Sequence, residues 1–419
     1  MKYRLYNILV HLALPFLLPY LFLRMIKGKT LAGIWERFGI VDKGKLQRLS
    51  RHKVVWFHAV SVGETKTLMP LARLFKKRHP EAGILFSTVT ATGRDVLLKE
   101  AQDLVSAVIY LPFDVSWAVG RLIRLTRPCL FVVAEKEVWP NLFYSLKRND
   151  VPIVVVNGAI SERSYKRYRF FAFLFKDVFS MVSCYCAKTD IDLERALMLG
   201  VEKDKTGHTG NLKFDMEIVP RLEDDAGLVH AIGGEPLLVA GSTHDGEEEI
   251  IIRVYKRLKR EFPCLRLVIA PRHPERFEKV SSLLREGGTD FAKRTVNGRK
   301  DVCLLDTVGE LSRVYALSTI SFVGGSLIPV GGHNLMEPAY FAKPVLYGHY
   351  ISSALQMAEL LEANGAGARV RDEEDLYDNL RRLLKDPESA ILMGKKGRSV
   401  VEANRGATER CLLHMERFF

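Results

Sequence analysis

Residues 54–64 read VVWFHAVSVGE, a short apolar run that leads directly into a glycine and a glutamate. The run predicts a buried strand over Val54–His58 with a helix beginning immediately after it, because strands of a covered parallel sheet are continuously apolar. Amphipathic stretches at 65–78, 92–103 and 115–126 alternate with further apolar runs. This alternation predicts a parallel sheet covered by helices on both faces.

The same alternation continues along the chain and falls into two arrays. The first array predicts strands at Val54–His58, Ile84–Thr88, Ala107–Leu111, Leu130–Ala134, Ile153–Asn157 and Met181–Cys186. The second predicts strands at Leu237–Gly241, Leu265–Ala270, Val302–Leu305, Ile320–Val323 and Val345–Tyr347, before a helical region at 373–413. Charged residues and glycines over 202–215 interrupt the pattern and predict a linker. The expected fold is α/β, with two doubly wound domains facing a cleft and ligands at the carboxyl ends of the strands.

Composition excludes several classes of protein. The 419 residues are 47% hydrophobic and 26% charged, which is the balance of a globular chain and not of a disordered, collagen-like or polytopic membrane protein. The six cysteines are scattered without a CxxC pair, so neither a disulfide framework nor a zinc site is expected. A reducing compartment fits this cysteine usage.

The net charge of +13 is concentrated in the first half of the chain. Residues 1–210 contain 33 Lys and Arg against 18 Asp and Glu, whereas 211–419 contain 29 against 31. Such an asymmetry indicates an anionic partner for the first half, which includes nucleic acid, a phospholipid surface or a phosphorylated substrate. A basic face kept for solubility explains the charge equally well.

The N-terminus carries an apolar segment. Residues 6–23 read YNILVHLALPFLLPYLFL, and basic residues flank this run on both sides. Its length is close to the minimum for a membrane span, and no small-residue cleavage site follows it. We therefore expect a retained membrane anchor with the rest of the chain on the cytoplasmic side, either spanning the bilayer or lying in its interface.

Acids follow two strands of the first array. Glu64 stands where a helix begins after the first strand, where it either complements the positive helix end or serves as a general base. Glu135 and Glu137 follow the fourth strand in the stretch AEKEVWPN, residues 134–141. One of these two acids is expected to be structural.

The loops of the second array predict an anion site. Small and hydroxyl residues open a helix at GSTHDGEE, 241–248, where backbone N–H groups can hold phosphate. Arg272 follows the next strand, at the predicted cleft edge, and a guanidinium there suits a phosphate or carboxylate. In GGSLIPVGGHNLMEPA, 324–339, two glycine pairs allow close approach of backbone to a ligand, and Glu337 follows one helical turn later.

Taken in order, these motifs resemble the Kdo transferases, which transfer 3-deoxy-D-manno-oct-2-ulosonic acid (Kdo) in lipopolysaccharide assembly. The resemblance covers roughly residues 30–345. It is carried by HAVSVGE at 58–64, E-x-E-x-WPN at 135–141, TGNLKFD at 209–215, GSTHDGEE at 241–248, APRHPER at 270–276, GGSLIPVGGHN at 324–334 and EPA at 337–339.

The resemblance implies a GT-B fold, in which two Rossmann-like domains face a cleft. It implies an N-terminal membrane anchor at 1–29, an acceptor-binding domain at 30–208 and a domain binding the donor CMP-Kdo at 209–387. The remaining segment, 388–419, is expected to supply a C-terminal helix that crosses back to the first domain.

It also implies the reaction. Kdo would pass from CMP-Kdo to a lipid A precursor with inversion and without a metal or other cofactor, at the cytoplasmic face of the inner membrane of a Gram-negative cell. The partners are then the lipid A precursor, CMP-Kdo and membrane phospholipid, with no nucleic acid. The number of Kdo units transferred is not implied.

Site residues carry over from the motifs as implications of the resemblance. Glu64 would be the general base and Glu135 a second catalytic acid. The acceptor would be bound by Ser61, Gly63 and Lys136. The donor would be bound by Ser242, Thr243, Arg272, His273, Gly324, Gly325, Ser326, Gly332, Asn334 and Glu337.

Two positions depart from the family pattern. Lys136 stands between the two motif acids, where a small residue is expected, and Ala159 stands where the family tends to have an arginine. We hypothesise that Lys136 restores a positive charge near the place of the absent arginine.

Other readings share parts of this pattern. A different GT-B transferase or a nucleotide-sugar epimerase with a uridine donor would share the fold, but not the anchor together with the HAVSVGE and WPN motifs. A non-catalytic binder of acidic glycolipid would not need Glu64, Glu135, Arg272 and Glu337. A nucleic-acid-binding protein would explain the charge and not the apolar N-terminus.

Overall fold

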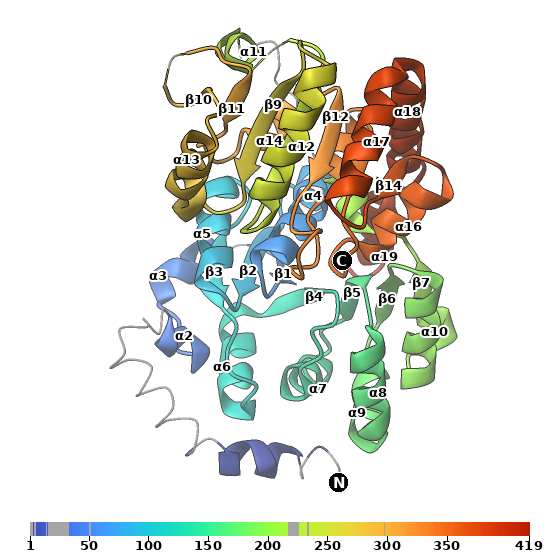
Figure 1. Cartoon of the computed structure of the whole chain (residues 1–419). Helices are drawn as coiled ribbons and strands as arrows, with labels where there is room; N and C mark the ends of the chain where they lie inside the picture. Colours follow the sequence, from blue (N-terminus) through green and yellow to red (C-terminus); the bar gives the residue numbers. More distant parts are fainter. Residues whose placement is uncertain are drawn as a thin grey trace. The chain divides into compact units, whose positions relative to one another are not determined.

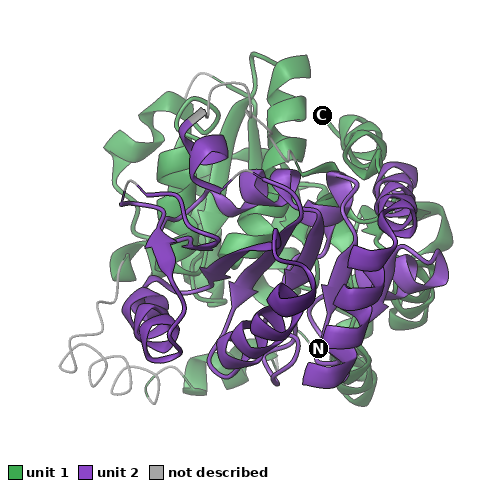
Figure 2. Ribbon diagram, turned by 45° about the horizontal axis from the view of Figure 1, so that its top comes forward, with its two compact units in different colours: residues 1–216, 405–419 green, residues 217–404 purple. Residues whose placement is uncertain are grey.

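The structure is a computed structural model (Figure 1). It describes residues 3, 6–13, 15, 33–49, 52–216, 226–232, 234–296 and 298–419. The chain forms two compact units (Figure 2). Unit 1 comprises residues 1–216 and 405–419, and unit 2 comprises residues 217–404.

Unit 1 is built on a parallel sheet of seven strands in the order β3-β2-β1-β4-β5-β6-β7. Its strands are β1 (Val54–His58), β2 (Gly83–Thr88), β3 (Ala107–Tyr110), β4 (Pro128–Ala134), β5 (Ile153–Gly158), β6 (Cys184–Ala187) and β7 (Thr206–His208). All the residues of β1, β2, β5 and β6 are buried, as the apolar runs predict for a sheet covered on both faces.

Helices cover both faces of this sheet. Its helices are α2 (Ile34–Arg37), α3 (Lys43–Leu46), α4 (Val62–Arg78), α5 (Ala91–Glu100), α6 (Ser116–Thr126), α7 (Pro140–Arg148), α8 (Glu162–Phe170), α9 (Ala172–Phe179), α10 (Asp190–Leu199) and α19 (Ala407–Glu416). One core cluster joins the sheet to α6, α7, α9 and α10, and another joins the opposite face to α4, α5 and α19.

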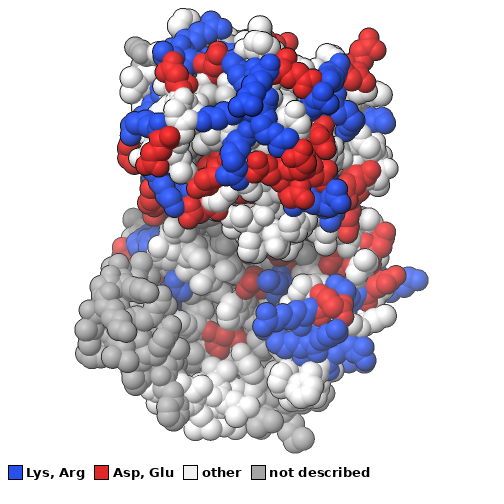
Figure 3. Space-filling model, in the orientation of Figure 1, with Lys and Arg blue, Asp and Glu red and all other residues white. Residues whose placement is uncertain are grey.

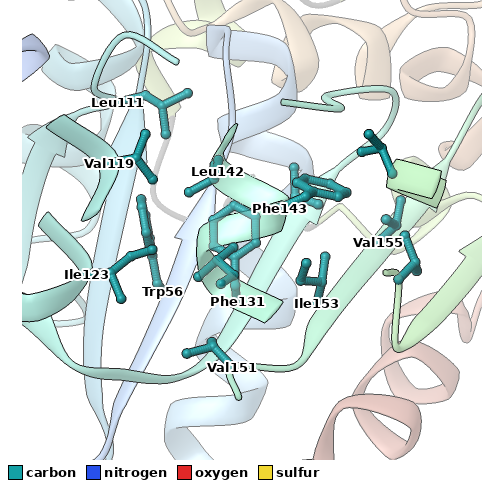
Figure 4. Close-up of a cluster of buried hydrophobic side chains, with 14 of the residues drawn as sticks. Trp56, Leu111, Val119, Ile123, Phe131, Leu142, Phe143, Val151, Ile153 and Val155 are labelled. Carbon is teal, nitrogen blue, oxygen red and sulfur yellow. The ribbon is translucent and has the colours of Figure 1, made fainter. Parts of the chain in front are cut away.

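The centre of the first cluster lies beneath β1 and β4 (Figure 4). The ring of Trp56 on β1 packs edge to face against Phe131 on β4, with their centroids 4.8 Å apart. Its indole N–H donates to Ser87 Oγ on β2 at 2.7 Å. This packing holds the two central strands rigidly, so the residues that follow their carboxyl ends have fixed starting points.

Unit 2 repeats the arrangement with a second seven-stranded parallel sheet, in the order β10-β11-β9-β8-β12-β13-β14. Its strands are β8 (Leu237–Thr243), β9 (Arg266–Pro271), β10 (Phe291–Lys293), β11 (Val302–Leu304), β12 (Ile320–Val323), β13 (Val345–Tyr347) and β14 (Gly367–Arg369). Its helices are α11 (Ala226–Ile232), α12 (Glu247–Glu261), α13 (Phe277–Glu286), α14 (Leu311–Leu317), α15 (Met336–Tyr340), α16 (Leu355–Ala363), α17 (Glu373–Lys385) and α18 (Pro387–Ala403).

The predicted linker over 202–215 is wrong. This segment contains β7 and a helical turn at Leu212–Asp215. Leu212 is fully buried in the core of unit 1, and β7 is a three-residue edge strand that is partly exposed and has no apolar run to reveal it. Residues 209–216 therefore belong to unit 1, whereas the sequence placed them at the start of the second domain.

The C-terminal segment 388–419, which was expected to supply a helix that crosses back to the first domain, divides between the units. Helix α18 belongs to unit 2, and helix α19 belongs to unit 1. Asp215 explains how α19 is held, because its carboxylate accepts the N–H groups of Gly406 at 2.7 Å and Thr408 at 2.6 Å. The apolar face of α19 then packs on α4.

The predicted anchor at 1–29 lies largely outside the described residues. Its described part includes residues 6–13, which are helical. Within the part of the chain that is described, no helix combines the length and the apolar character needed to cross a membrane.

Candidate active site

Each sheet reverses its winding direction once, and ligands of such folds bind beside this point. In unit 1 the reversal lies between β1 and β4, and in unit 2 between β8 and β12. The loops that follow these four strands contain most of the motifs singled out from the sequence. The loops of unit 1 form an acidic site, and those of unit 2 form an imidazole site.

The acidic site begins with Glu64 in the first turn of α4. Ser61 caps this helix and accepts the N–H of Glu64, and the Glu64 carboxylate in turn accepts the N–H of Val60 at 2.7 Å. The Ser61 hydroxyl donates to the other carboxylate oxygen, Oε1, at 3.3 Å. These bonds, which differ from a capping box in that Glu64 accepts the N–H of the residue before the cap, fix the direction of the carboxylate. Glu64 therefore has the structural role at the helix start that the sequence suggested. This role is compatible with service as a general base.

Burial raises the pKa of Glu64, and the negative charge of Glu135 adds to the rise. The hydrogen bond from Val60 and the positive charge of Lys136 act against it. The pKa remains above that of an exposed glutamate. Such a carboxylate is a stronger base than an exposed one.

The second part of the acidic site follows β4. Glu135 adopts a positive φ of 57° and donates its N–H to the carbonyl of Val156, so the chain turns sharply at the end of the strand. Glu135 and Glu137 are both half-buried, and Lys136 between them is exposed. A positive φ at a residue with a side chain is strained, which is a feature frequently found at functional sites.

Glu137 has the more perturbed carboxyl. Burial and the charge of Glu64 raise its pKa to about 7, with Lys136 acting in the opposite direction. The sequence analysis left open which of the two motif acids is structural. A half-buried carboxyl that titrates near neutral pH beside another acid is a candidate for proton transfer, so Glu137 joins the site.

Lys188 lies near Glu135, and a second lysine, Lys213, lies near Lys188. Lys188 directly follows β6, and Lys213 lies in the helical turn after β7. Burial and the charge of Lys213 lower the pKa of Lys188, whereas Glu135 raises it. The mixture of acids and lysines suits a phosphorylated hydroxyl compound, because lysines hold phosphate and a carboxylate accepts the hydroxyl proton.

The predicted acceptor residues occupy different positions in this site. Ser61 is half-buried and serves as the cap of α4, while Gly63 and Lys136 are exposed. A methyl group added at Gly63 would meet only Ser61 Oγ, at 3.9 Å, so the space above the helix start is open. Ala159, at the end of β5, is half-buried.

In the imidazole site, Glu247 connects the two central loops. It is the first residue of α12 and is fully buried. One carboxylate oxygen accepts the N–H groups of His244 at 3.0 Å and Gly325 at 2.7 Å, and the other accepts those of Ser326 at 3.0 Å and Leu327 at 2.9 Å. Four backbone donors satisfy this buried charge and hold the loop after β12 against the loop after β8.

This network corrects the predicted role of the first glycine pair. The glycine-rich motif predicted that the backbone at Gly324, Gly325 and Ser326 approaches a ligand. Instead, Gly324 donates its N–H to the Gly241 carbonyl, and the N–H groups of the next two residues donate to Glu247. Gly324 is needed for another reason, since a Cβ there would meet the Ser242 carbonyl oxygen at 2.6 Å. The close approach is to the chain itself.

Two hydroxyl residues predicted to line the donor site are also internal. Ser326 is fully buried, donates to the Val323 carbonyl at 2.6 Å and accepts the N–H of Gly348 at 2.8 Å. Thr243 is fully buried and donates to Glu248 at 3.1 Å. These hydroxyl groups shape the loops and have no free face for a ligand.

Gly332 is likewise buried, and its N–H donates to Gly325 at 2.6 Å. The remaining predicted residues are accessible. Ser242 is half-buried with a φ of 56°, and Asn334 is exposed. Asn334 donates to Glu337 at 3.0 Å, which fixes these two side chains relative to each other.

Three histidines come together although they lie in three different loops. The Nε2 atoms of His244 and His333 are 2.7 Å apart, so one ring donates to the other, and the rings are nearly parallel. The ring of His273 packs edge to face against His244 at 5.4 Å. Burial, Arg272 and the neighbouring imidazoles lower the pKa of His333 to about 4, and burial and the same kinds of neighbours lower that of His244.

Two arginines border these rings. Arg276 is neutralised, since it bonds both oxygens of Glu248 and lies 3.0 Å from Asp245. Arg272 is exposed, and its guanidinium forms no ion pair with any side chain that the structure describes. Arg272 and the three imidazoles together form a donor-rich site for an anion such as phosphate or carboxylate.

Among the described residues, no three His, Cys, Asp or Glu side chains are grouped so that they could hold a metal ion. The acidic site can accept a proton from a hydroxyl group, and the imidazole site can bind an anion. These are the two capacities that transfer of a group from an anionic donor to an alcohol requires.

Some features of the two sites were not predicted from the sequence. Lys188 and Glu247 were given no role, and Glu137 was left undecided. His244 and His333 were expected to hydrogen-bond substrate or backbone, and their contact with each other was not predicted. Lys188 has the same signal as Glu135, a charged residue directly after a buried strand. The burial of Glu247 and the histidine pair depend on loops that meet only in the fold.

Comparisons with known proteins show the family of this chain. Residues 32–216 match the family model described as 3-deoxy-D-manno-octulosonic-acid transferase (kdotransferase). The chain is 34% identical over 365 residues to the 3-deoxy-D-manno-octulosonic acid transferase of Haemophilus influenzae, covering 85% of each chain. It is 30% identical to the enzyme of that name from Bordetella pertussis, covering 97% of each chain.

Among solved structures, the UDP-GlcNAc 2-epimerase of Neisseria meningitidis bound to UDP-GlcNAc is similar with a TM-score of 0.64. The match covers 87% of this chain and 100% of that one, at 14% identity, and so concerns the fold alone.

Proposed function

The chain belongs to the 3-deoxy-D-manno-octulosonic-acid (Kdo) transferase family, and from this premise we propose that it transfers Kdo from CMP-Kdo to a lipid A precursor. Its family makes it a glycosyltransferase of lipopolysaccharide biosynthesis, and its two Rossmann-like units match the fold of its solved GT-B neighbours. The donor, the acceptor and the roles of individual residues are the proposal.

The observation that carries the proposal is the position of Glu64 at the winding reversal of unit 1. Glu64 would take the proton from the acceptor hydroxyl as its oxygen attacks the anomeric carbon of Kdo. The bond from that carbon to the CMP phosphate oxygen breaks, CMP leaves as the anion, and the configuration inverts. The N–H of Val60 orients one carboxylate oxygen, so Oε1, which receives only the 3.3 Å bond from Ser61, is the oxygen that accepts the proton.

Glu135 and Glu137 complete the acid–base set in this account. Burial and the charge of Glu135 raise the pKa of Glu64, and burial and the charge of Glu64 raise the pKa of Glu137 to about 7, which strengthens the base at neutral pH. Lys136, Lys188 and Lys213 would attract the phosphate groups of the acceptor, and Ser61 and Gly63 would lie beside its sugar. The excess positive charge of the first half of the chain supports this acceptor assignment.

Unit 2 would hold the donor. Arg272 and His273 would bind its phosphate or the Kdo carboxylate, together with His244 and His333 from the adjacent loops. Ser242, Asn334 and Glu337 remain as candidates for the nucleoside, with Asn334 orienting Glu337 toward ribose hydroxyl groups. No step of this proposal uses a metal ion.

We propose that the N-terminal segment anchors the enzyme to the cytoplasmic face of the inner membrane. The support is the apolar run at 6–23 with its basic flanks. Three apolar side chains of the described helix at 6–13, Ile8, Leu9 and Leu12, are more than half exposed, as expected for a segment whose apolar partner is a lipid.

The test is a transfer assay with CMP-Kdo generated in place and a tetra-acylated lipid A precursor, in the presence of EDTA. We expect CMP release and a product whose mass increases by whole Kdo units, and the masses would count the units transferred. If neither CMP nor product forms, the proposed reaction is wrong, and lipid binding without transfer would favour a binding protein. Loss of transfer in EDTA with recovery on adding Mg²⁺ would contradict the metal-independent mechanism.

A further inference from the structure

Helices α8 and α9 form a projecting pair in unit 1, with the sequence ERSYKRYRFFAFLFKDVF over 162–179. One side of the pair is firmly packed. Tyr168 is buried against Phe175 and Phe179, with ring centroids 4.7 Å and 5.5 Å apart, and these residues join the core beneath the sheet. The position of the other side is therefore set by the core of unit 1.

That other side carries three exposed phenylalanines where the two helices meet. The exposed fractions are 79% for Phe170, 42% for Phe171 and 52% for Phe173. Their rings touch in sequence, with centroids 4.9 Å apart for the first pair and 6.5 Å for the second. Single exposed apolar residues are ordinary, but a contiguous aromatic patch marks a surface that contacts a protein or a membrane.

The charges around the patch select between these partners. Five basic residues on the two helices are exposed, namely Arg163, Lys166, Arg167, Arg169 and Lys176. The acids of the same stretch are Glu162 and Asp177, and Glu162 is already paired with Arg195 and, at 3.5 Å, with Lys166. Figure 3 shows the basic side chains gathered on this part of unit 1 above uncharged surface. Aromatic side chains beside several basic ones fit the interface of an anionic bilayer.

The patch lies on the same side of unit 1 as the N-terminal helix at 6–13. Helix α7 connects them, because Tyr3 stacks on Tyr144 of α7 at 3.6 Å and α9 packs against α7. Both elements lie at the lower end of unit 1 in Figure 1. A membrane that meets the exposed Ile8, Leu9 and Leu12 can therefore also meet the α8–α9 patch.

We propose that the α8–α9 patch is a second membrane contact of this protein, separate from the N-terminal segment. The three phenylalanines enter the boundary between headgroups and acyl chains, and the basic residues bind lipid phosphates. A single anchor lets unit 1 turn freely, whereas two contacts fix its orientation on the surface. The inference rests on the proposed membrane location but not on the proposed reaction.

The direct test places a fluorescent reporter at the patch of the full-length protein. The variant is Phe170→Trp, and the vesicles contain phosphatidylethanolamine and phosphatidylglycerol with brominated acyl chains. We expect the added emission, taken as the difference from the wild type, to shift to the blue and to be quenched. The matched control is Leu392→Trp on α18 of unit 2, a leucine that is 54% exposed, where neither change is expected. An unquenched signal from position 170 on vesicle-bound protein would overturn the proposal.

A second test measures partition onto the same vesicles without bromine. Replacing Phe170, Phe171 and Phe173 by serine is expected to weaken partition about tenfold or more, because interfacial binding scales with the buried apolar area. Lys166→Gln with Arg167→Gln should weaken it by about tenfold on anionic vesicles, and much less on phosphatidylcholine. The control pair is Lys395→Gln with Lys396→Gln on α18, both exposed. Equal partition of the patch variants and the wild type would contradict the proposal.

Transfer measured with the acceptor in detergent micelles separates this inference from the proposed reaction. The phenylalanine variants should transfer at the wild-type rate in micelles and more slowly on vesicles. If the wild type itself transfers nothing in micelles, the proposed reaction fails, while the vesicle results still decide the membrane contact.

Discussion

Each unit has a glutamate near the start of the helix that follows its first strand. The two glutamates differ in their burial and in their hydrogen bonds. Glu64 in unit 1 is half-buried and receives one backbone N–H and one hydroxyl group. Glu247 in unit 2 is fully buried and receives four backbone N–H groups. Equivalent positions in one fold thus give a carboxylate with unused accepting capacity and one whose capacity is fully used.

The residues around the two glutamates also differ. Burial and the charge of Glu135 raise the pKa of Glu64 and make it a stronger base, and burial and the charge of Glu64 raise the pKa of Glu137. The Glu247 carboxylate stabilises the two loops that present His244 and His333. The comparison supports the proposed division, in which unit 1 would supply the acid–base chemistry and unit 2 would supply an anion site.

The largest effect is expected for Glu64, the proposed reactive glutamate of the pair. Glu64→Gln keeps an oxygen to accept the N–H of Val60 but cannot take a proton, so turnover should fall by about 10³-fold. The measurement is CMP release with saturating donor and acceptor.

The matched control for this change is Asp375→Asn in unit 2. Asp375 has the same local bonds, since its N–H donates to the cap residue Asp372 and its carboxylate accepts the N–H of Arg371. Turnover of this control should stay within about twofold of the wild type, because loss of a cap affects stability and not the reaction. Equal losses in the two variants would show that Glu64 is merely a cap.

The second-largest effect is expected for Glu247, the structural glutamate of the pair. Glu247→Gln turns an amide N–H₂ toward backbone donors and should destabilise unit 2 by about 3 kcal/mol. All four tryptophans, at 35, 56, 117 and 139, belong to unit 1, so their fluorescence follows unit 1 while circular dichroism follows both units. We expect a lower denaturant midpoint by circular dichroism and an unchanged one by fluorescence. Glu249→Gln, two residues along α12, is the control, and a similar loss there would contradict the account.

Arg272→Gln should weaken binding of CMP by about 30- to 100-fold while leaving the stability of the protein unchanged, because a charge-assisted hydrogen bond to phosphate is lost. Isothermal titration with CMP measures it. Arg285→Gln, an arginine at the far end of α13, should bind as the wild type does. If Arg272→Gln binds CMP with wild-type affinity, Arg272 is not part of the donor site.

A smaller effect tests the electrostatics of the acidic site. Glu137 has a folded-state pKa of about 7 against an ordinary value of 4.5, so the folded protein binds more protons than the unfolded one between these pH values. Its contribution to stability is therefore lost as pH rises from about 4.5 to 7.

Glu137→Gln removes this loss. At pH 8 the variant should be more stable than the wild type by about 2 kcal/mol, with the difference vanishing near pH 4.5. Tryptophan fluorescence during denaturation measures it in unit 1. Glu194→Gln, at an exposed position on α10, should show no pH-dependent difference. If the stability difference between Glu137→Gln and the wild type grew toward low pH, the predicted direction of the pH dependence would be wrong.

The smallest effect concerns the two departures from the family pattern. If Lys136 replaces a missing positive charge, Lys136→Ala should lower turnover about two- to fivefold, the range for an exposed charge. Adding Ala159→Arg to that variant should restore turnover. Unchanged turnover in both variants would remove the idea.

The sequence predicted the central strands well because their apolar runs are continuous. β1 and β12 lie where the alternation places them, and most other central strands differ by one or two residues. β7, β10 and β14 escaped because each is a three-residue strand toward the edge of its sheet, with little apolar character. The segment 202–215 was read as a linker for the same reason.

The sequence predicts where a side chain lies when one residue carries the signal, and not when the position depends on packing. Glu135 and Arg272 directly follow strands, Glu64 lies in the first turn of the helix after β1, and the fold brings each to the expected edge of its sheet. The burial of Ser326 and Thr243 could not be predicted, since it depends on Glu247 drawing one loop against another. The His244–His333 contact joins residues 89 positions apart and has no local pattern.

The most direct test of the division between the units is titration of CMP into Glu64→Gln and Arg272→Gln, with transfer measured on the same samples. The account predicts that Glu64→Gln binds CMP like the wild type and does not transfer, and that Arg272→Gln binds CMP weakly. Loss of CMP binding in Glu64→Gln with normal binding in Arg272→Gln would contradict it.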